Sequence, residues 1–254
     1  MKKVTAFIGT ETRKYTYRAV QEFEKRLKER GEVEFEYVFL SDYTLDYCRG
    51  CKVCFDRGEE YCPLKDDRDV LLRKMEESDG VVFASPNYAF HMSARMKNFL
   101  DRAAFAIHRP KFFGRPCTAV VAQGAFGGGD IVKHLGTAGA NMGFHTTKGC
   151  CVTTREPMTD ARSNKLVQET RKAADRFHEA LSRPTPAPSF FRLMLFRVTR
   201  SSISALDDSY RDYRYYRDMG WFESDYFHET RLNPLKKLAG GVSDFVGRRM
   251  AKRQ

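Results

Sequence analysis

The stretch Gly80-Val-Val-Phe-Ala-Ser85 is an uninterrupted apolar run that begins at a glycine and is followed by Pro86. Runs of this kind, without alternating polar residues, are typical of strands that are buried on both faces of a parallel sheet. Residues 3–8 and 117–123 are similar short runs. We therefore predict a parallel sheet that helices cover on both faces.

The segments between these runs have apolar residues at helical spacing. In residues 15–30 they recur every three or four positions, and Gly31 follows as a stop signal. The predicted strands are residues 3–8, 33–40, 80–85, 117–123 and 145–153, and the predicted helices are residues 15–30, 67–77, 92–107, 130–142 and 160–181. Five strand–helix units predict a doubly wound five-stranded α/β sheet, in the flavodoxin-like order rather than that of the longer dinucleotide-binding sheets.

Three prolines within five residues interrupt this pattern after Arg183. Because proline cannot continue a helix, we expect an extended linker over residues 183–189. The linker separates a flavodoxin-like domain of residues 1–182 from a helical extension of residues 190–254. The extension is rich in aromatic residues, which predicts that it packs against the first domain or against a second subunit.

Composition and charge narrow the class of protein. Hydrophobic residues make up 42% of the 254 residues, which excludes a disordered chain. The net charge is +11, but no block of five or six like charges occurs, so we do not expect a nucleic-acid-binding protein. No apolar stretch is long enough to cross a bilayer, and Met1-Lys2-Lys3 does not introduce a secretory leader. We expect a cytoplasmic protein with reduced cysteines.

A loop with the composition of a phosphate site follows the first predicted strand. Residues 9–17 contain three threonine hydroxyls, two cations and the amides of a helix start. The loop lacks the glycine patterns of nucleoside triphosphatases and dinucleotide folds, so a monophosphate fits better than a pyrophosphate. The alternative interpretation is an ordinary helix cap with surface polar residues.

Two further loops follow the third and fourth predicted strands, at the sheet edge where doubly wound folds bind ligands. They read Ser85-Pro-Asn-Tyr-Ala-Phe-His91 and Gln123-Gly-Ala-Phe-Gly-Gly-Gly-Asp130. Two aromatic side chains and an amide can frame a planar ring, and glycines let backbone N–H groups approach a ligand closely. The candidate cofactor-binding residues of the three loops are Thr10, Thr12, Arg13, Thr16, Tyr17, Ser85, Pro86, Asn87, Tyr88, Phe90, Gln123, Gly124, Gly127 and Gly128.

With Ser93-x-x-Met96-Lys-Asn-Phe-Leu-Asp-Arg102, the first two loops resemble the NAD(P)H-dependent FMN reductases of the flavodoxin-like superfamily, over about residues 1–180. The resemblance implies that FMN binds with its ring against residues 86–90 and 123–128. It implies that the phosphate is held by Thr10, Arg13, Thr16 and Tyr17.

One departure from the family is Glu11, whose carboxylate would repel a phosphate. We expect this carboxylate to point to solvent or to pair with Arg13 or Lys14.

Four cysteines lie within fifteen residues, at positions 48, 51, 54 and 62. Three thiols at two-residue intervals can converge on one iron–sulfur cube, and a fourth can close it. Zinc is more often held by two separated Cys-x-x-Cys pairs, and a loop without metal can pack its thiols as apolar filler; the residues leave all three alternatives open. The run also resembles the iron–sulfur flavoproteins, which implies a [4Fe-4S] cluster on Cys48, Cys51, Cys54 and Cys62 beside the FMN.

The other titratable candidates are expected to have structural roles. Cys117, Cys150 and Cys151 lie on predicted strands, where they should pack in the core. His91 and His108 are expected to be structural or surface residues, because hydride transfer to a flavin needs orientation more than a protein acid. No catalytic side chain is therefore predicted.

The resemblance predicts an FMN-dependent NAD(P)H oxidoreductase that passes electrons from a nicotinamide to the flavin and on to an acceptor, through a [4Fe-4S] cluster if one is bound. Without a dinucleotide fingerprint, the nicotinamide should be a transient donor on the flavin face. The alternative is a flavodoxin-like electron carrier for a protein partner, and a thiol or metal sensor is a third interpretation. A homodimer or larger assembly is expected, because the flavin edge and the aromatic extension both need cover.

Overall fold

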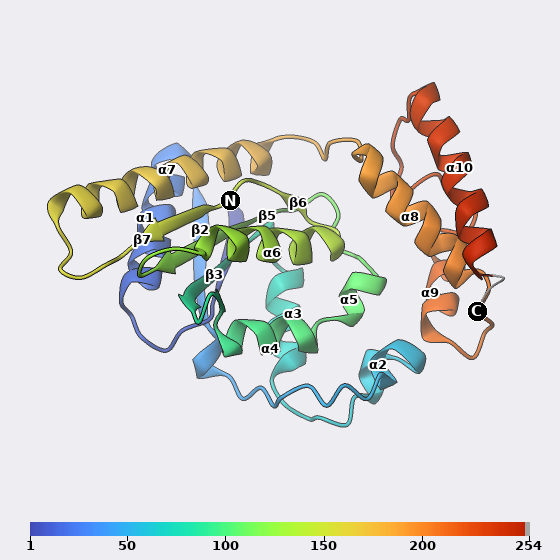
Figure 1. Cartoon of the computed structure of the whole chain (residues 1–254), viewed down its shortest axis with the longest axis horizontal. Helices are drawn as coiled ribbons and strands as arrows, with labels where there is room; N and C mark the ends of the chain where they lie inside the picture. The colour runs from blue at the N-terminus through green and yellow to red at the C-terminus, as the bar shows by residue number, and fades with distance from the viewer. Residues whose placement is uncertain (252–254) are drawn as a thin grey trace. The chain divides into compact units, whose positions relative to one another are not determined.

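The computed structural model describes residues 1–251 of the chain (Figure 1). Contacts divide the chain into two compact units. The first comprises Met1–Arg49 and Leu64–Thr185, and the second comprises Gly50–Pro63 and Pro186–Gln254, of which residues 252–254 lie outside the described part. The sequence predicts the cysteine loop within residues 1–182, whereas in the structure residues 50–63 group with the C-terminal helices, because a short helix of the loop packs on one of them.

The first unit is built on a parallel sheet in the flavodoxin-like order. The strands run β2 (Val33–Phe39), β1 (Lys2–Ile8), β3 (Gly80–Tyr88) and β5 (Pro116–Gln123), and β6 (His145–Thr146) and β7 (Cys150–Thr153) pair with the outer edge of β5. A two-residue strand, β4 (His91–Met92), pairs antiparallel with the end of β3. The predicted fold class is confirmed.

The fifth predicted strand, residues 145–153, is divided into β6 and β7. The backbone of Gly149 lies against β5 so closely that a Cβ atom there would be 2.2 Å from the carbonyl oxygen of Ala119. This close approach of Gly149 interrupts the regular pairing along β5, between β6 and β7. Only glycine can occupy the position without displacing β5.

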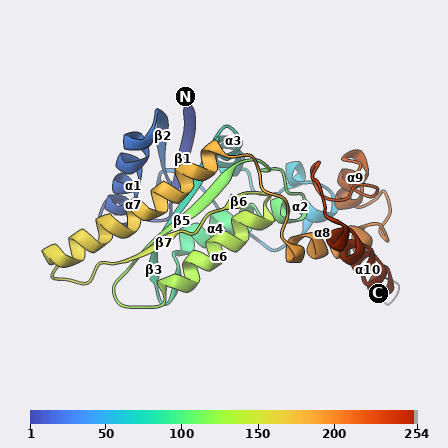
Figure 2. The same cartoon turned by 90° about the horizontal axis from the view of Figure 1, so that it is seen from above.

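Helices cover both faces of the sheet. Helices α1 (Tyr15–Arg30) and α7 (Asp160–Ser182) pack on one face, and α4 (Ala94–Arg102) and α6 (Gly128–Asn141) lie on the other (Figure 2). The unit also contains α3 (Arg68–Glu76), α5 (Phe105–His108) and a 3-10 turn, η1 (Leu40–Asp42). The single helix predicted over residues 92–107 is wrong, because Ser93 caps the start of α4 with its Oγ, which accepts from the N–H of Met96, and the helix ends at Arg102.

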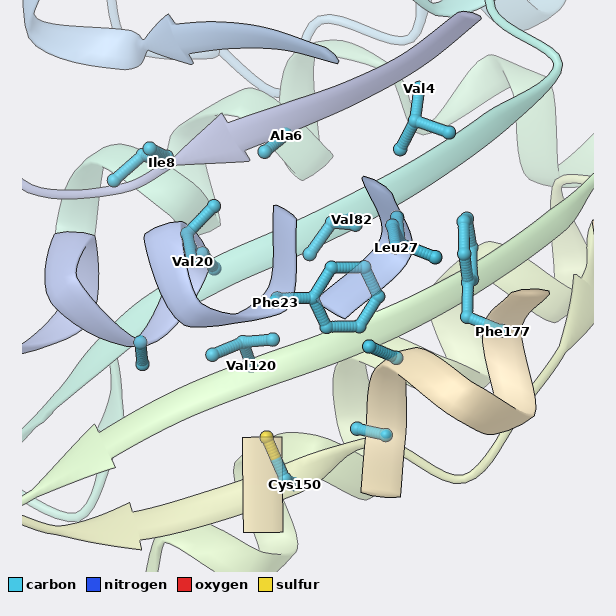
Figure 3. Packing of buried hydrophobic residues seen from close by; sticks show 14 of the residues in the cluster. Val4, Ala6, Ile8, Val20, Phe23, Leu27, Val82, Val120, Cys150 and Phe177 are labelled. Carbon is cyan, nitrogen blue, oxygen red and sulfur yellow. The ribbon is translucent and has the colours of Figure 1, made fainter. Parts of the chain in front are cut away.

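The core lies between the sheet and the helix pair α1 and α7 (Figure 3). Phe23 of α1 and Phe177 of α7 meet edge to face with ring centroids 5.5 Å apart. They pack with the buried residues Val4, Ala6, Ile8, Val20, Leu27, Val82, Val120 and Cys150. Cys117 and Cys150 are buried, as predicted, and Cys151 is half-buried.

The second unit is helical and aromatic. Its elements are α2 (Val53–Asp56), the 3-10 turn η2 (Glu59–Tyr61), α8 (Phe190–Ile203), α9 (Arg211–Asp218) and α10 (Pro234–Ala251). Trp221 is fully buried and donates a 3.0 Å hydrogen bond to the carbonyl of Phe227. Asp244 of α10 accepts from both Arg197 and Arg200 of α8, so a buried charge network joins these two helices. No helix within residues 1–251 is both long and apolar enough to cross a membrane.

Candidate functional site

The carboxyl ends of β1, β3 and β5 bring the three predicted loops together at one edge of the sheet. These strands are neighbours in the order of the sheet and run parallel, so their following loops leave on the same side. Gly9 shows how close the loops lie to the helix after β3: a Cβ atom on Gly9 would be 2.6 Å from Oγ of Ser93. The edge therefore combines polar, aromatic and glycine residues from distant parts of the chain.

The loop between β1 and α1 has the features of an anion site. Thr10 is buried and its Oγ1 accepts a 3.2 Å hydrogen bond from the N–H of Thr12. Helix α1 begins at Tyr15, and no side chain within residues 1–251 caps it. The first N–H groups of a helix have no partner inside the helix and carry partial positive charge. The start of α1 can therefore donate to a bound phosphate.

Aromatic rings hold the predicted cation of this loop in place. The guanidinium of Arg13 lies 4.5 Å from the ring centroid of Phe39 and 5.9 Å from that of Tyr17. Such cation–π contacts restrict a side chain that is otherwise exposed. Thr16, in contrast, is buried in the first turn of α1.

Glu11 pairs with a residue that the sequence did not indicate. Its carboxylate accepts from the guanidinium of Arg95 in α4, and both side chains are largely exposed. The expected exposure of Glu11 to solvent is therefore confirmed, whereas the alternative, a pair with Arg13 or Lys14, is wrong. The ion pair directs the negative charge toward α4, which reduces its repulsion of an anion at the start of α1.

The loop after β3 is a tight hairpin with an unusual backbone. Asn87 pairs with Met92 and Tyr88 with His91, so Ala89 and Phe90 form a two-residue turn. Their φ angles are 48° and 63°. Turns of this kind prefer asparagine and glycine, and a left-handed conformation costs a larger residue about 1–2 kcal/mol. Strained turns persist where the surrounding structure requires them, often at functional sites.

The hairpin is anchored at its base by hydroxyl groups. Oγ of Ser85 accepts a 2.9 Å hydrogen bond from the N–H of Ser93 and donates to the carbonyl of Pro86 at 2.8 Å. Ser85 and Pro86 are both buried. These two predicted site residues therefore support the base of the hairpin, and residues 88–91 after them are exposed.

The loop after β5 folds back on the side chain of Gln123. Its Oε1 accepts a 2.7 Å hydrogen bond from the N–H of Gly128, and its Nε2 donates to Oγ1 of Thr153 at 3.2 Å. Gly127 has a φ of 88°, and a Cβ atom on Gly128 would lie 2.4 Å from Sγ of Cys151. Gly124, in contrast, has open space around its Cα. Gly127 is thus required by the backbone conformation and Gly128 by the closeness of Cys151, whereas Gly124 leaves room beside the loop.

Three aromatic rings stand exposed around this edge. Tyr88, Phe90 and Phe126 expose 58%, 64% and 68% of their surface. The rings of Phe90 and Phe126 lie 5.2 Å apart. Exposed large apolar groups that gather at one place mark a binding surface for a partner or ligand.

One buried polar atom at the same edge has no partner in the described residues. Oδ1 of Asn87 is shielded from solvent and accepts no hydrogen bond there, although Nδ2 of the same amide donates to the carbonyl of Phe126 at 2.8 Å. A buried acceptor of this kind is costly unless a ligand or water supplies a donor. The edge therefore fits a planar aromatic ligand that carries N–H groups and an anionic tail, as FMN does.

The predicted metal-binding cysteines lie on one loop of the structure. Cys48 and Cys51 are exposed, Cys54 and Cys62 are half-buried, and the described residues form no disulfide bond. Cys54 lies on α2, which begins directly after Lys52, a residue with a φ of 61°. Within residues 1–251, no three His, Cys, Asp or Glu side chains are arranged to hold a metal ion. The thiols suit a cluster in their chemistry, while the conformation described here does not assemble them.

Comparison with known proteins identifies the family. A family model for NADPH-dependent FMN reductases matches residues 2–156, which contain all three loops. The chain belongs to this family. FMN and NAD(P)H are the cofactor and donor that the family name indicates.

Similar proteins of known name are flavoproteins. An "iron-sulfur flavoprotein" of Archaeoglobus fulgidus is 40% identical over 103 residues, which cover 41% of this chain and 46% of that protein. An "iron-sulfur flavoprotein" of Methanocaldococcus jannaschii is 30% identical over 204 residues, which cover 70% of this chain and 96% of that protein. The chain thus spans about half the length of the first of these relatives.

Solved structures with the same fold include flavin enzymes. The structure of RosB with bound 8-demethyl-8-formylriboflavin-5'-phosphate has a TM-score of 0.59 at 12% identity and covers 92% of both chains. An azoreductase from Bacillus anthracis has a TM-score of 0.55 at 14% identity and covers 70% of this chain and all of its own. At these identities, the similarity extends to the fold alone.

Two residues of this edge are absent from the predicted candidate residues. Phe126 lies within residues 123–128, which the resemblance places against the ring, and a large aromatic residue inside a glycine-rich loop is a usable signal. Cys151 is predicted to pack in the core, but its Sγ lies beside Gly128, beneath the third loop. Burial raises the pKa of Cys151 to about 11, so this thiol stays protonated at neutral pH.

The two histidines considered from sequence lie at the surface. His91 and His108 are both exposed. The ring of His91 stacks on that of His134 in α6, with centroids 5.5 Å apart. This contact places a third histidine, His134, near the hairpin of residues 87–92. The sequence did not predict the position of His134.

Proposed function

We propose that this protein is an FMN-dependent oxidoreductase that takes electrons from NAD(P)H and passes them to a second acceptor. The observation that carries the proposal is the edge formed by three loops, which presents exposed aromatic rings and the buried, unsatisfied Oδ1 of Asn87. Family membership supports the same cofactor.

The phosphate of FMN would be held by the loop between β1 and α1. Thr10 and Thr12 supply hydroxyls that already bond to each other. Arg13 supplies the cation, and the first N–H groups of α1, from Thr16 and Tyr17, supply further donors. A site with one fixed cation and one helix start suits a dianionic monophosphate.

The ring of FMN would lie against the other two loops. Tyr88 and Phe90 offer aromatic faces for stacking. Asn87 Oδ1 offers an acceptor for a ring N–H, and the backbone at Gly124, which has open space around it, offers an N–H donor. Gln123 holds this backbone through the N–H of Gly128. The tail phosphate and the ring would thus be fixed by separate loops.

When bound, FMN supplies hydride acceptance from the nicotinamide and electron donation to the acceptor. The protein's own residues orient the ring and exclude water from one of its faces. No dinucleotide-binding glycine fingerprint occurs in the sequence. We therefore propose that the nicotinamide and the acceptor use the exposed face beside Phe90 and Phe126 in turn.

We further propose that Cys48, Cys51, Cys54 and Cys62 bind a [4Fe-4S] cluster. The spacing of the four thiols and the names of the relatives support this assignment. Within residues 1–251 these thiols do not form a ready metal site, so binding would require the loop to rearrange. Anaerobic purification with iron and sulfide analysis tests it, and fewer than about two irons per chain would contradict it.

Reduction of the reconstituted protein tests the main proposal. The protein is saturated with FMN and mixed anaerobically with NADH or NADPH in a stopped-flow instrument. Bleaching of the flavin by either nucleotide is the expected result. FMN uptake without bleaching would indicate the alternative, an electron carrier for a protein partner. A protein that takes up no FMN would refute both. Light scattering of the same sample tests the predicted homodimer.

A further inference from the structure

The motif Lys97–Arg102 of α4 divides its side chains between two faces of the helix. Lys97 and Asp101 form an exposed ion pair, with Nζ 2.6 Å from Oδ1. Asn98 and Arg102, each one position further, are 7% and 4% exposed. This spacing of four residues places the second pair on one buried face of α4. The proposed FMN site uses neither residue.

Asn98 binds the backbone at the start of the cysteine segment, residues 48–62. Its Nδ2 donates to the carbonyls of Leu45 and Asp46 at 3.0 and 3.2 Å. Its Oδ1 accepts a 3.2 Å hydrogen bond from the N–H of Cys48. A single amide side chain thus satisfies three backbone groups of an extended segment that has no strand partner in residues 1–251.

Arg102 joins the two ends of the same segment. It forms a buried ion pair with Asp66, in which both side chains are 2% exposed, and Nη2 donates to Oδ1 at 3.0 Å. Nη1 also donates to the carbonyl of Asp46 at 2.9 Å. Asp66 in turn accepts a 2.9 Å hydrogen bond from the N–H of Asp46. Residues before Cys48 and after Cys62 therefore share one buried network.

A second set of bonds crosses between the same two ends. The N–H of Thr44 donates to Oδ2 of Asp67 at 2.7 Å, and the N–H of Asp67 donates to the carbonyl of Thr44 at 2.9 Å. These bonds close the loop at its base. Closing a loop in advance removes much of the conformational entropy that its residues would lose when they assemble around a ligand.

We propose that Asn98, Arg102 and Asp66 form a clamp that fixes both ends of the cysteine segment, so that these residues position its thiols for a cofactor. The cofactor part of this inference rests on the proposed cluster, whereas the clamp itself rests on the contacts above. A charged pair that is fully buried destabilises the fold when one partner is lost. Because the pair of Asp66 and Arg102 lies at the base of the cysteine segment, its loss should loosen that segment in particular.

Asn98→Ala tests the clamp, with Lys97→Ala on the exposed face of the same helix as the matched control. The first measurement is limited trypsin digestion of the apoprotein, followed by mass spectrometry of cuts after Arg49, Lys52 and Arg57. We expect Asn98→Ala to be cut in this segment about tenfold faster than the wild type, and Lys97→Ala to be cut at the wild-type rate. Equal rates in all three proteins would overturn the clamp.

The second measurement is iron and sulfide per chain after anaerobic reconstitution, with FMN content and thermal stability measured on the same samples. We expect about tenfold weaker iron retention in Asn98→Ala, as for other residues that orient metal ligands, with FMN content unchanged. An equal loss of iron and FMN would show a general folding defect and overturn the positioning role. If the wild type binds no iron, the proposed cluster fails, and the digestion rates alone decide the clamp.

Asp66→Asn provides a second variant that keeps the shape of the side chain. It removes the charge partner of Arg102 but retains a group that can accept from the N–H of Asp46. Faster cutting of the segment in this variant also supports the clamp. Cutting at the wild-type rate in a folded Asp66→Asn protein contradicts the part assigned to the ion pair.

Discussion

The side chain of Asn87 donates a 2.8 Å hydrogen bond to the carbonyl of Phe126 and so joins the loop after β3 to the loop after β5. The two residues are 39 positions apart in the chain. The bond uses Nδ2, and it leaves the buried Oδ1 of the same amide without a partner in the described residues. One side chain therefore both assembles the site and leaves an acceptor for its ligand.

Replacing Asn87 by alanine should weaken FMN binding. The substitution removes the acceptor and the bond that aligns the third loop, which together predict a rise in Kd of about tenfold, or about 1.4 kcal/mol. Quenching of flavin fluorescence during titration measures the Kd. Asn164→Ala, at an exposed position of α7, is the control and should bind FMN normally. An unchanged Kd in Asn87→Ala would remove this residue from the site.

Substitutions at Ala89 and Phe90 of the hairpin turn should separate the effect of backbone strain from the effect of ligand contact. Ala89→Gly should raise the free energy of unfolding by about 1 kcal/mol, because glycine adopts the left-handed conformation without steric cost, and it should leave FMN binding intact. Phe90→Gly relieves similar strain but removes an exposed ring, so it should weaken FMN binding several-fold. Denaturant unfolding and flavin titration are the two measurements. If both variants bind FMN equally well, Phe90 does not contact the flavin.

Arg13 should distinguish FMN from riboflavin, which lacks the phosphate. In Arg13→Met the affinity for FMN should fall about tenfold, a loss typical of a charge-assisted hydrogen bond. The affinity for riboflavin should not change. Lys28→Met, in the last turn of α1, removes a cation that lies away from the loop and serves as the control. A parallel loss of both affinities in Arg13→Met would place the phosphate elsewhere.

The seven cysteines should differ sharply in reactivity. Burial raises the pKa of Cys150 to about 12 and that of Cys151 to about 11. At pH 8 only about a thousandth of Cys151, and less of Cys150, is thiolate, the form that reacts. Iodoacetamide should therefore label the exposed Cys48 and Cys51 of the apoprotein first. Peptide mass spectrometry resolves the sites, and rapid labelling of Cys150 in the folded protein would contradict the structure.

The ion pair of Asp66 predicts a specific response to acid. Burial alone would raise the pKa of Asp66, but hydrogen bonds from Arg102 and from the backbone outweigh it, and the net shift is downward. A carboxylate with a lowered pKa stabilises the fold fully above its ordinary value of about 3.9, and this contribution is lost as the pH falls through the folded pKa.

Asp66→Asn should therefore lose about 3 kcal/mol of stability at pH 7, since it leaves the buried Arg102 without its charge partner. The difference between the variant and the wild type should shrink as the pH falls below about 4 toward the lowered pKa of the folded carboxyl, because the unfolded chain then binds a proton that the folded protein does not. Urea unfolding at several pH values measures this difference. A difference that stays constant down to pH 3 would show that the charge of Asp66 is not the stabilising feature.

Local patterns were enough to predict the helices with regular apolar spacing and the strands with continuous apolar runs. The helix of residues 15–30 has the bounds predicted from its spacing and its stop signal. The hairpin at Ala89 and Phe90 could not be predicted in this way, because its turn lacks the asparagine and glycine that usually mark such a conformation. The pairing of Asn87 with Met92 and of Tyr88 with His91 imposes this turn.

The amino-acid sequence by itself determined the parallel sheet, its five-unit order and the family, because continuous apolar runs, helical periodicity and short motifs are properties of neighbouring residues. The site residues within the three loops were also proposed from sequence and stay predictions. Only the tertiary structure decided that Asn87 meets Phe126, that Asn98 and Arg102 hold the base of the cysteine loop, and that Glu11 pairs with Arg95. These contacts join residues 36 to 84 positions apart. The packing of whole elements sets these contacts, and local periodicity does not encode it.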